Sequence, residues 1–341
     1  MIPRAVLLWT AILITIGCAT APSELKFDSV PPSSSEGPDP NRSHPPLVTL
    51  EDYQHFDRLQ FEIISDEGAG AGVTGARRVT VRIVGHDEDL RLKTKDFPSG
   101  LDGTNNSPRK ELAAYTIQRF FLDPVDYVVP TVGVRCVPLD DWKTRHTHSP
   151  TRVHGTECAL ISYAFWLQNV TLPEPLYDEQ RFLNDARYAY YLANFNLLTY
   201  LVSHHDMRYG NALVSKNDED RRVFAIDNGT TFGAFFFNWF YPPSFSWRNI
   251  KVPAIPRNAV NRLRKLKQED LRSLAVIVQL EADQDGILRI EKPGDPIDEE
   301  EGVSVRGTTV QLGLTEDEIE NIWERIEHLL EDVDDGKLGL F

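Results

Sequence analysis

Two aspartates and an asparagine surround a pair of short apolar segments in the middle of the chain, and this spacing constrains the fold and chemistry most. Asn211 follows Asp206 by five residues and begins the apolar segment Ala212–Val214. The second apolar segment, Phe224–Ile226, leads directly into Asp227. Phosphoryl transfer needs one carboxylate to orient a hydroxyl, and an amide oxygen with a second carboxylate to hold metal on the phosphates. The spacing therefore indicates a phosphoryl-transfer site, although Asp-Asn-Gly is also a common hairpin turn.

Together the two segments resemble the protein-kinase-like superfamily in its atypical branches. These are the phosphatidylinositol 3- and 4-kinases, the HipA-like kinases and the secretory-pathway kinases of the Golgi casein kinase type. They carry a D-R-H-x-x-N or related loop, followed by an I-D-x-G-x-x-F element. The resemblance implies that Asp206 is the catalytic aspartate and that Asn211 and Asp227 bind metal. Arg208 and the pair His204/His205 depart from the D-R-H order, so their roles stay open.

Three upstream segments extend the resemblance in the correct order. Lys93–Pro98 resembles the strand that carries the ATP-binding lysine, with Lys93 as first choice and Lys95, on the same face, as the alternative. Glu111 matches the helix glutamate that orients this lysine in the family, although a surface glutamate at a helix start is an ordinary alternative. The segment Val129–Arg135 is similar to the strand that these families place next.

The resemblance implies an α+β, two-lobed kinase-like fold with a small β-rich N-lobe and a larger helical C-lobe. It also implies a phosphotransferase that uses ATP with Mg²⁺ or Mn²⁺ to modify a hydroxyl, with protein Ser/Thr as first choice of substrate. A lipid or small-molecule kinase, and a catalytically inactive nucleotide-binding or scaffold protein, are the alternatives. Transfer of AMP instead of phosphate also stays open.

The N-terminus has the pattern of an export signal. An apolar run, Ala5–Ile16, is too short to span a bilayer comfortably and suits the core of a signal peptide. Gly17-Cys18 resembles the lipobox of bacterial lipoproteins, although Thr15 stands where leucine is usual. We expect Cys18 to be lipid-anchored at the cell envelope, on the periplasmic side of the outer membrane given Ala19. A plain secretory signal, an uncleaved anchor and a cytoplasmic protein are the alternatives.

The residues after Cys18 predict four regions. A signal occupies 1–18 and a flexible tether 19–49, because seven prolines and six serines lie between Ala19 and Pro46. The N-lobe then spans 50–160 and the C-lobe 161–341. In an oxidising compartment Cys136 and Cys158 would form a disulfide or remain two buried thiols. The net charge of −15 argues against nucleic acid as a partner.

Periodicity predicts the elements of the globular part. Alternating or apolar runs predict strands at 61–64, 78–84, 90–95 and 131–137, and an apolar segment at 157–165 that crosses between lobes. Helical spacing predicts helices at 110–122, 179–202, 258–266, 268–280 and 315–333, with a loop and hairpin at 203–233. The glycine-rich segment Glu67–Gly75 suits either a phosphate-covering loop or a flexible hairpin. Asp283–Gly286 resembles part of a calcium loop but lacks its last ligand, so it predicts a turn.

Overall fold

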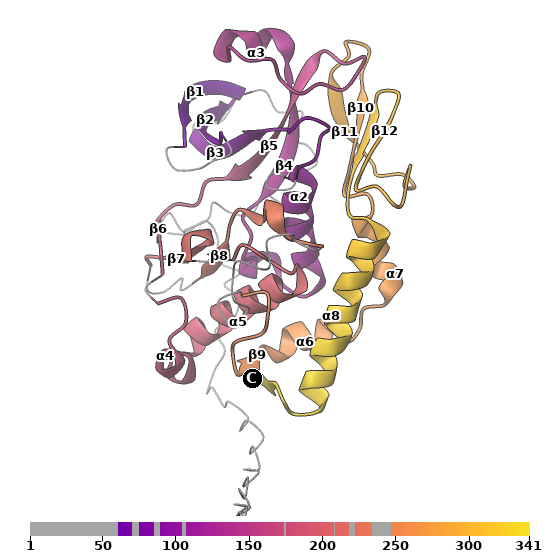
Figure 1. Cartoon of the computed structure of the whole chain (residues 1–341). Helices are drawn as coiled ribbons and strands as arrows, with labels where there is room; N and C mark the ends of the chain where they lie inside the picture. Colours follow the sequence, from indigo (N-terminus) through magenta and orange to yellow (C-terminus); the bar gives the residue numbers. More distant parts are fainter. Residues whose placement is uncertain are drawn as a thin grey trace, which may run out of the picture.

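The computed structural model describes residues 61–69, 75–84, 89–103, 107–173, 175–207, 209–217, 222–233 and 247–341. The expected signal, Cys18 and the tether lie outside these residues, as do Arg208 and positions 70–74 of the glycine-rich segment. The described part combines antiparallel sheets with helices, so its class is α+β as predicted (Figure 1).

A five-stranded antiparallel sheet occupies the first half of the described chain (Figure 1). Its order is β1-β2-β3-β5-β4, with bounds β1 Phe61–Gly68, β2 Arg77–Ile83, β3 Asp89–Asp96, β4 Val132–Pro138 and β5 Cys158–Phe165. Because side chains alternate along a strand, Val79, Val81 and Leu92 are buried on one face of this sheet. The predicted strands are confirmed, and the segment expected to cross between lobes is β5, an interior strand.

Helix α2, Pro108–Ile117, connects β3 to β4 and lies against this sheet. Ser107 caps it by accepting a hydrogen bond from the Lys110 amide, and proline at the first helical position suits a helix start. The 3₁₀ turns Gln118–Phe120 and Pro124–Asp126 follow it. Helix α3, Leu139–Arg145, lies between β4 and β5.

The predicted helix over 179–202 is two helices, α4 (Glu179–Asn184) and α5 (Ala186–Leu201). Asp185 separates them because it adopts an extended conformation, and its side chain accepts a hydrogen bond from the Tyr188 amide to cap α5. Helix α5 is buried over most of its length, which makes it a core helix rather than a surface one.

A small sheet, β6-β7-β8, follows α5 and carries the central motif. Its strands are β6 Val170–Thr171, β7 Ala212–Ser215 and β8 Val223–Ala225. The 3₁₀ turns Tyr209–Asn211 and Asn228–Thr230 lie directly before β7 and after β8. The predicted hairpin is therefore confirmed.

The C-terminal part is less helical than predicted. The expected helix over 268–280 is wrong: α7 ends at Leu271, the 3₁₀ turn Arg272–Leu274 follows, and the chain then becomes extended. The extended chain enters a four-stranded sheet of order β11-β10-β13-β12, of which only β10 overlaps the expected helix. Its strands are β10 Val278–Ala282, β11 Leu288–Glu291, β12 Val303–Arg306 and β13 Thr309–Leu312. The β-branched run Val276–Val278 suits an extended chain better than a helix.

The turn predicted at Asp283–Gly286 joins β10 to β11. Asp283 Oδ1 accepts hydrogen bonds from the amides of Asp285 and Ile287, at 3.0 and 2.9 Å. These contacts close a hairpin loop, so the interpretation as a turn is confirmed.

The remaining elements close the core. Helix α6, Arg257–Leu263, and α7, Gln268–Leu271, precede the C-terminal sheet. Helix α8, Glu316–Asp334, follows it and buries Ile319, Ile322 and Ile326. The chain ends in β14, Gly339–Leu340, which pairs in parallel with β9, Ala254–Ile255. Among the described residues, no helix has the length and apolar character that crossing a bilayer requires.

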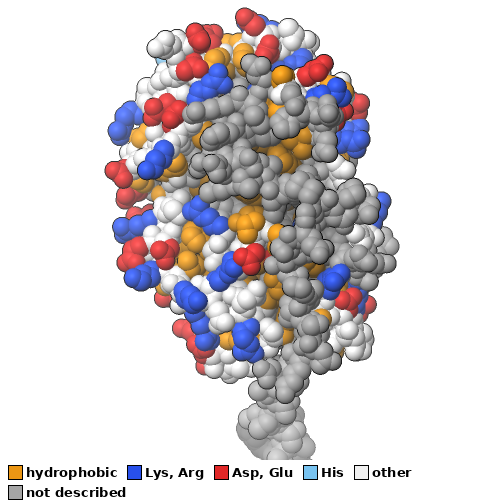
Figure 2. Space-filling view, turned by 180° about the vertical axis from the view of Figure 1, so that it is seen from behind, with side chains coloured by type: hydrophobic (Ala, Val, Ile, Leu, Met, Phe, Trp, Pro, Cys, Tyr) orange, Lys and Arg blue, Asp and Glu red, His pale blue; other side chains and the backbone are white. Residues whose placement is uncertain are grey.

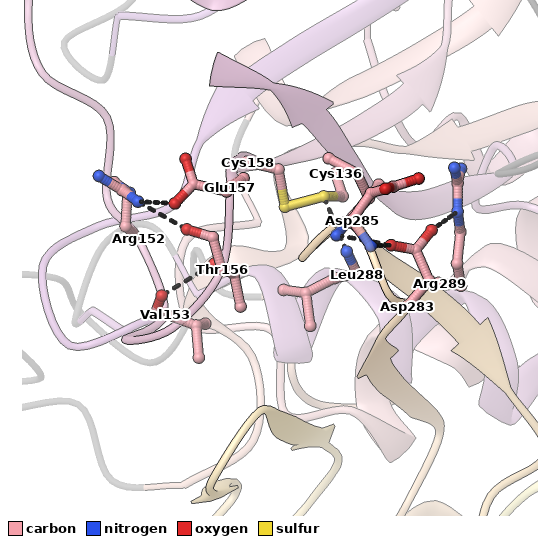
Figure 3. Close-up of a disulfide and its surroundings, with 11 residues drawn as sticks. Cys136, Arg152, Val153, Thr156, Glu157, Cys158, Asp283, Asp285, Leu288 and Arg289 are labelled. Carbon is pink, nitrogen blue, oxygen red and sulfur yellow. Dashed lines mark hydrogen bonds and ion pairs between the residues drawn. A yellow bond between two sulfur atoms is a disulfide. The ribbon is translucent and has the colours of Figure 1, made fainter.

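A disulfide joins Cys136 of β4 to Cys158 of β5 (Figure 3). Of the two states that the sequence left open for these cysteines, the structure has the bonded one. The bond lies where the two sheets meet, because the Leu288 amide of β11 is 3.1 Å from Cys136 Sγ. The Glu157 amide also donates to the Gly286 carbonyl at 2.8 Å. The disulfide therefore joins neighbouring strands of one sheet at the place where that sheet contacts the C-terminal sheet.

Charges of both signs are interspersed over the described surface that faces the viewer in Figure 2, with no large region of one sign. The acidic run Asp295–Glu301 is exposed for most of its length. Most buried apolar side chains form one cluster, which reaches from α2 and β4 through α5 to α8.

Candidate functional site

Strand β3 presents two lysines from one face. Lys93 and Lys95 are two residues apart, so their side chains point to the same side of the sheet, opposite Leu92 and Thr94. The Lys95 side chain is 9% exposed, whereas that of Lys93 is 24% exposed. Lys95 is thus the more deeply placed of the two cations.

Both lysines contact Asp227, the residue that follows β8 by two positions. Lys95 Nζ donates to Asp227 Oδ1 at 3.2 Å, and Lys93 Nζ donates to the same oxygen. Burial would raise the pKa of the Asp227 carboxyl, but the two ammonium groups outweigh it and hold that pKa at about 2. Asp227 is therefore an anion at every pH at which the protein is expected to work.

The backbone of Asp227 adopts a left-handed conformation, with φ of 57° and ψ of 53°. Non-glycine residues rarely adopt this conformation, because Cβ approaches the carbonyl oxygen. The contacts with the two lysines hold the Asp227 side chain in place although its backbone conformation is unfavourable, which is typical of functional sites.

Glu111 connects α2 to Lys95 of β3 and to the loop that contains Asp227. Its Oε1 lies 3.5 Å from Lys95 Nζ, and its Oε2 accepts a hydrogen bond from the Asn228 amide at 3.0 Å. Burial would lower the pKa of Lys95, but Glu111 and Asp227 raise it above its ordinary value, so the amine stays charged. The sequence paired Glu111 with Lys93 as first choice and with Lys95 as the alternative, and the contact in the structure is with Lys95.

The hairpin brings Asn211 beside the loop that contains Asp227. Ala212 and Ala225 are partners across β7 and β8, and the Ile226 amide donates to the Asn211 carbonyl at 3.0 Å. Asn211 Nδ2 donates to the backbone carbonyl and to Oδ2 of Asp206, at 2.8 and 3.1 Å. Asp206 and Asn211, which precede β7, therefore lie beside the loop after β8 that contains Asp227, at one end of the hairpin.

The six residues singled out by sequence form two groups. Lys93, Lys95, Glu111 and Asp227 form one ion-paired network, and Asp206 with Asn211 forms a hydrogen-bonded pair. The β7–β8 backbone joins the groups through the contact between Ile226 and Asn211. The first group carries two positive and two negative charges, so its formal charges balance.

The residues at the hairpin end suit a hard divalent cation. Within the described part of the chain, the side-chain hydrogen bonds of Asn211 come from Nδ2, so Oδ1 is available there as an acceptor, and Asp227 is ionised. Within the described ranges no three His, Cys, Asp or Glu side chains cluster closely enough to hold a metal. An ion here would therefore need oxygens from a bound ligand, as Mg²⁺ commonly takes from phosphates.

The two histidines before Asp206 have different surroundings. His204 is completely buried, and burial lowers the pKa of its imidazole to about 4, with a smaller effect of His205 in the same direction. His205 Nε2 donates to the Gly233 carbonyl at 2.6 Å and lies 3.3 Å from Ser203 Oγ. His204 is thus a neutral core residue, and His205 fastens the Asp227 loop.

Two contributors were not found by sequence reasoning. Asn228 acts through its backbone amide, which no side-chain pattern encodes. Lys110, next to Glu111, donates to the Phe232 carbonyl at 2.7 Å and so fastens the end of the Asp227 loop to α2. A lysine beside the helix glutamate was the available signal, but its partner Phe232 is 122 residues away, so no local pattern points to the contact.

Comparisons with known proteins give few matches. No protein-family model matches the chain, and none of the curated protein sequences matches it. Among solved structures, the chain is similar to hydra Fam20 determined with sugar, at 13% sequence identity and a TM-score of 0.48. That similarity covers 82% of this chain and 87% of the other.

Proposed function

We propose that the chain is a kinase-like phosphotransferase that moves phosphate from ATP to a hydroxyl group. The observation that carries the proposal is the buried Lys95, held between Glu111 at 3.5 Å and Asp227 at 3.2 Å. The three residues come from β3, α2 and the loop after β8. A lysine oriented in this way is what binding of nucleotide phosphates requires of a kinase.

In this proposal Lys95, rather than Lys93, binds the α- and β-phosphates. Lys95 is the lysine that Glu111 contacts, and it keeps its charge although it is buried. Lys93 is more exposed and contacts Asp227 alone among these carboxylates. Lys93 therefore serves as a second cation at the outer side of the phosphates.

Asn211 and Asp227 would hold Mg²⁺ or Mn²⁺ together with phosphate oxygens. The metal would neutralise charge on the phosphates during transfer. The chain's own contribution is to keep Asp227 ionised and Asn211 oriented, through the two lysines and through Asp206.

Asp206 would orient the acceptor hydroxyl and take its proton. The hydroxyl oxygen forms a bond to the γ-phosphorus, the bond from that phosphorus to the β–γ bridging oxygen breaks, and ADP leaves. The hydrogen bond between Asp206 and Asn211 supports this role, because the acceptor hydroxyl and the metal must lie close together. The kinase resemblance favours a protein serine or threonine as acceptor.

A binding protein without catalysis is the second candidate, and the charge balance of the network favours it. Two lysines and two carboxylates already satisfy one another, so a nucleotide with metal must separate Asp227 from the lysines. A scaffold would keep this closed arrangement permanently. The two candidates therefore differ in whether the network opens for a nucleotide.

We propose that the protein works at the cell envelope, attached through a lipid on Cys18. The disulfide supports an oxidising compartment, because such bonds are rare in the cytoplasm. Cys18→Ser should then move the protein from the membrane fraction to the soluble fraction. A protein that stays in the membrane after this change would contradict the anchor.

The deciding experiment is a thermal-shift titration of the full chain with ATP and Mg²⁺ or Mn²⁺, beside Asp227→Asn. A ligand at a hundred times its Kd stabilises a fold by about 2.7 kcal/mol, which raises Tm by several degrees. We expect a metal-dependent rise that Asp227→Asn abolishes. ATP labelled at the γ- or the α-phosphorus would then separate phosphate transfer from AMP transfer. No shift with any nucleotide and metal would reject the kinase and favour the scaffold.

A further inference from the structure

The helix that carries Glu111 is attached to the C-terminal helix by a buried cluster of charges. Arg109 and Lys110, directly before Glu111, both contact Glu318 in the first turn of α8. Arg109 Nη1 donates to Glu318 Oε2 at 2.5 Å and Nη2 donates to Oε1 at 3.2 Å, which is a bidentate pair. Lys110 Nζ lies 3.4 Å from Glu318 Oε1. Such a pair fixes direction as well as distance.

Arg109 has further anchors that hold it in this position. Its Nε donates to Asp102 Oδ2 at 2.6 Å, and Nη1 also donates to the Gly313 carbonyl at 3.2 Å. The Arg109 and Glu318 side chains are each 9% exposed, so water weakens their pairing little. Arg109 therefore joins the start of α2 and the nearby Asp102 to the segment Gly313–Glu318, which is more than 200 residues away in sequence.

Lys110 extends the attachment to the site. Its ammonium contacts Glu318 on one side and donates to the Phe232 carbonyl, at the end of the Asp227 loop, on the other. A Cβ added at Gly233 would lie 3.8 Å from Glu318 Oε1 and 3.9 Å from Lys110 Nζ, so the residue after Phe232 is in the neighbourhood of both charged groups. Glu318 thus lies behind both the Glu111 helix and the Asp227 loop.

Glu318 is itself held by the start of α8. It is the third residue of a capping box, in which its Oε2 accepts from the Thr315 amide at 3.1 Å and Thr315 Oγ1 accepts from the Glu318 amide at 3.2 Å. The reciprocal bonds fix the carboxylate relative to the helix axis. Because Glu318 also binds Arg109 and Lys110, the position of α8 constrains the position of the first turn of α2.

We propose that Glu318 is a positioning residue, which acts through Arg109 and Lys110 to keep Glu111 in contact with Lys95. This inference rests on the proposed function, since it gives the C-terminal helix a part in nucleotide binding. A bidentate anchor on the residue two positions before Glu111 restricts rotation of the first turn of α2. The C-terminal helix is then a built-in support for the lysine–glutamate pair, and not only a cover for the core.

The test compares Glu318→Gln with Glu316→Gln. Both changes remove one negative charge from the first turn of α8, but Glu316 is exposed and its side chain lies outside the cluster. Isothermal titration with ATP and Mn²⁺ on the full chain measures Kd. We expect Glu318→Gln to weaken binding about tenfold and Glu316→Gln to leave it unchanged. Equal affinities of the two variants would overturn the proposal.

A double variant separates positioning from general damage. If Glu318 acts through Glu111, the Glu111→Gln/Glu318→Gln protein should bind no more weakly than Glu111→Gln alone. If the two substitutions acted independently, their fold-losses in affinity would multiply in the double variant, and that result would overturn the proposal. Gly302→Ala gives a second route, because its added Cβ would lie 2.5 Å from the Arg109 guanidinium and displace it. We expect this variant to weaken binding as Glu318→Gln does.

A measurement without nucleotide keeps this inference distinct from the kinase proposal. Amide hydrogen exchange in residues 110–114 reports the opening of the first turns of α2. Exchange there should become about tenfold faster in Glu318→Gln and stay unchanged in Glu316→Gln. If the wild-type chain binds no nucleotide, the kinase proposal fails while this measurement still decides whether Glu318 positions α2. Unchanged exchange in Glu318→Gln would reject the positioning role.

Discussion

Lys95 and Asp227, which are 132 residues apart in sequence, are joined by a contact of 3.2 Å between Nζ and Oδ1. Glu111 approaches the same ammonium at 3.5 Å. The lysine therefore links β3 to α2 and to the loop after β8. In the proposed function, a nucleotide would have to compete with Asp227 for this cation.

The first prediction concerns the division of work between the two lysines. Lys95→Met should abolish the nucleotide-dependent thermal shift, because the Glu111-oriented cation is lost, whereas Lys93→Met should weaken binding about tenfold. Arg91→Met is the control, since Arg91 lies on the same face of β3 two residues before Lys93 and is exposed. A larger loss in Lys93→Met than in Lys95→Met would restore Lys93 as the phosphate-binding lysine.

The choice between these lysines shows where sequence reasoning reached its limit at the site. A period of two places Lys93 and Lys95 on one face but does not say which lies nearer to α2. The depth of each lysine depends on how α2 packs on the sheet, which is a tertiary property. Similarly, the supporting contacts of Arg109 and Glu318 span 209 residues, so no local pattern pointed to them.

The fold was predictable where periodicity was strong. The strands of the first sheet alternate clearly, and α8 carries a regular apolar stripe behind a capping box, so both were found. The C-terminal sheet was missed because its strands are short and partly exposed, as the charged strand β11, Leu288–Glu291, illustrates. The break at Asp185 was missed because apolar spacing continues across it, while its capping role depends on backbone geometry.

A second prediction uses the left-handed backbone of Asp227. Asp227→Gly and Asp227→Ala both remove the carboxylate, but only glycine adopts a φ of 57° without strain. The glycine variant should be more stable than the alanine variant by about 1 kcal/mol in urea unfolding. At Asp206, which has no positive φ, the order should reverse, because glycine costs more chain entropy than alanine. The same order at both positions would contradict this account.

The third prediction concerns the disulfide between Cys136 and Cys158. The bond closes a segment with a sequence separation of 22 residues, so its removal should lower the free energy of unfolding by about 3 kcal/mol. Urea unfolding of the Cys136→Ala/Cys158→Ala protein measures the loss, and reduced wild-type protein should show a similar one. Nucleotide affinity should stay unchanged, because the bond joins β4 to β5 and makes no contact with Lys95, Glu111 or Asp227. A loss below 1 kcal/mol would mean that the pairing of β4 with β5 and the surrounding packing hold the segment without the bond.

The last prediction concerns acid sensitivity caused by His204. Burial holds the pKa of its imidazole at about 4, with a further lowering by His205 and an opposing effect of Asp227, against 6.5 for an ordinary histidine. The unfolded chain therefore binds a proton more readily between these values, so unfolding takes up a proton there. Stability from the neutral imidazole is complete above pH 6.5 and is lost as pH falls toward 4, by up to about 3 kcal/mol.

Urea unfolding of the wild type and of His204→Gln between pH 7.5 and 4 tests this prediction. The variant carries no titrating group at that position, so its free energy of unfolding should fall less steeply with acid than that of the wild type. His328→Gln is the control, because His328 is exposed on α8 and its side chain is 73% accessible. If the profiles of the wild type and His204→Gln run parallel, the buried imidazole does not cause the acid sensitivity. If they diverge below pH 6.5, protonation of a core residue two positions before Asp206 limits the acid stability of the site.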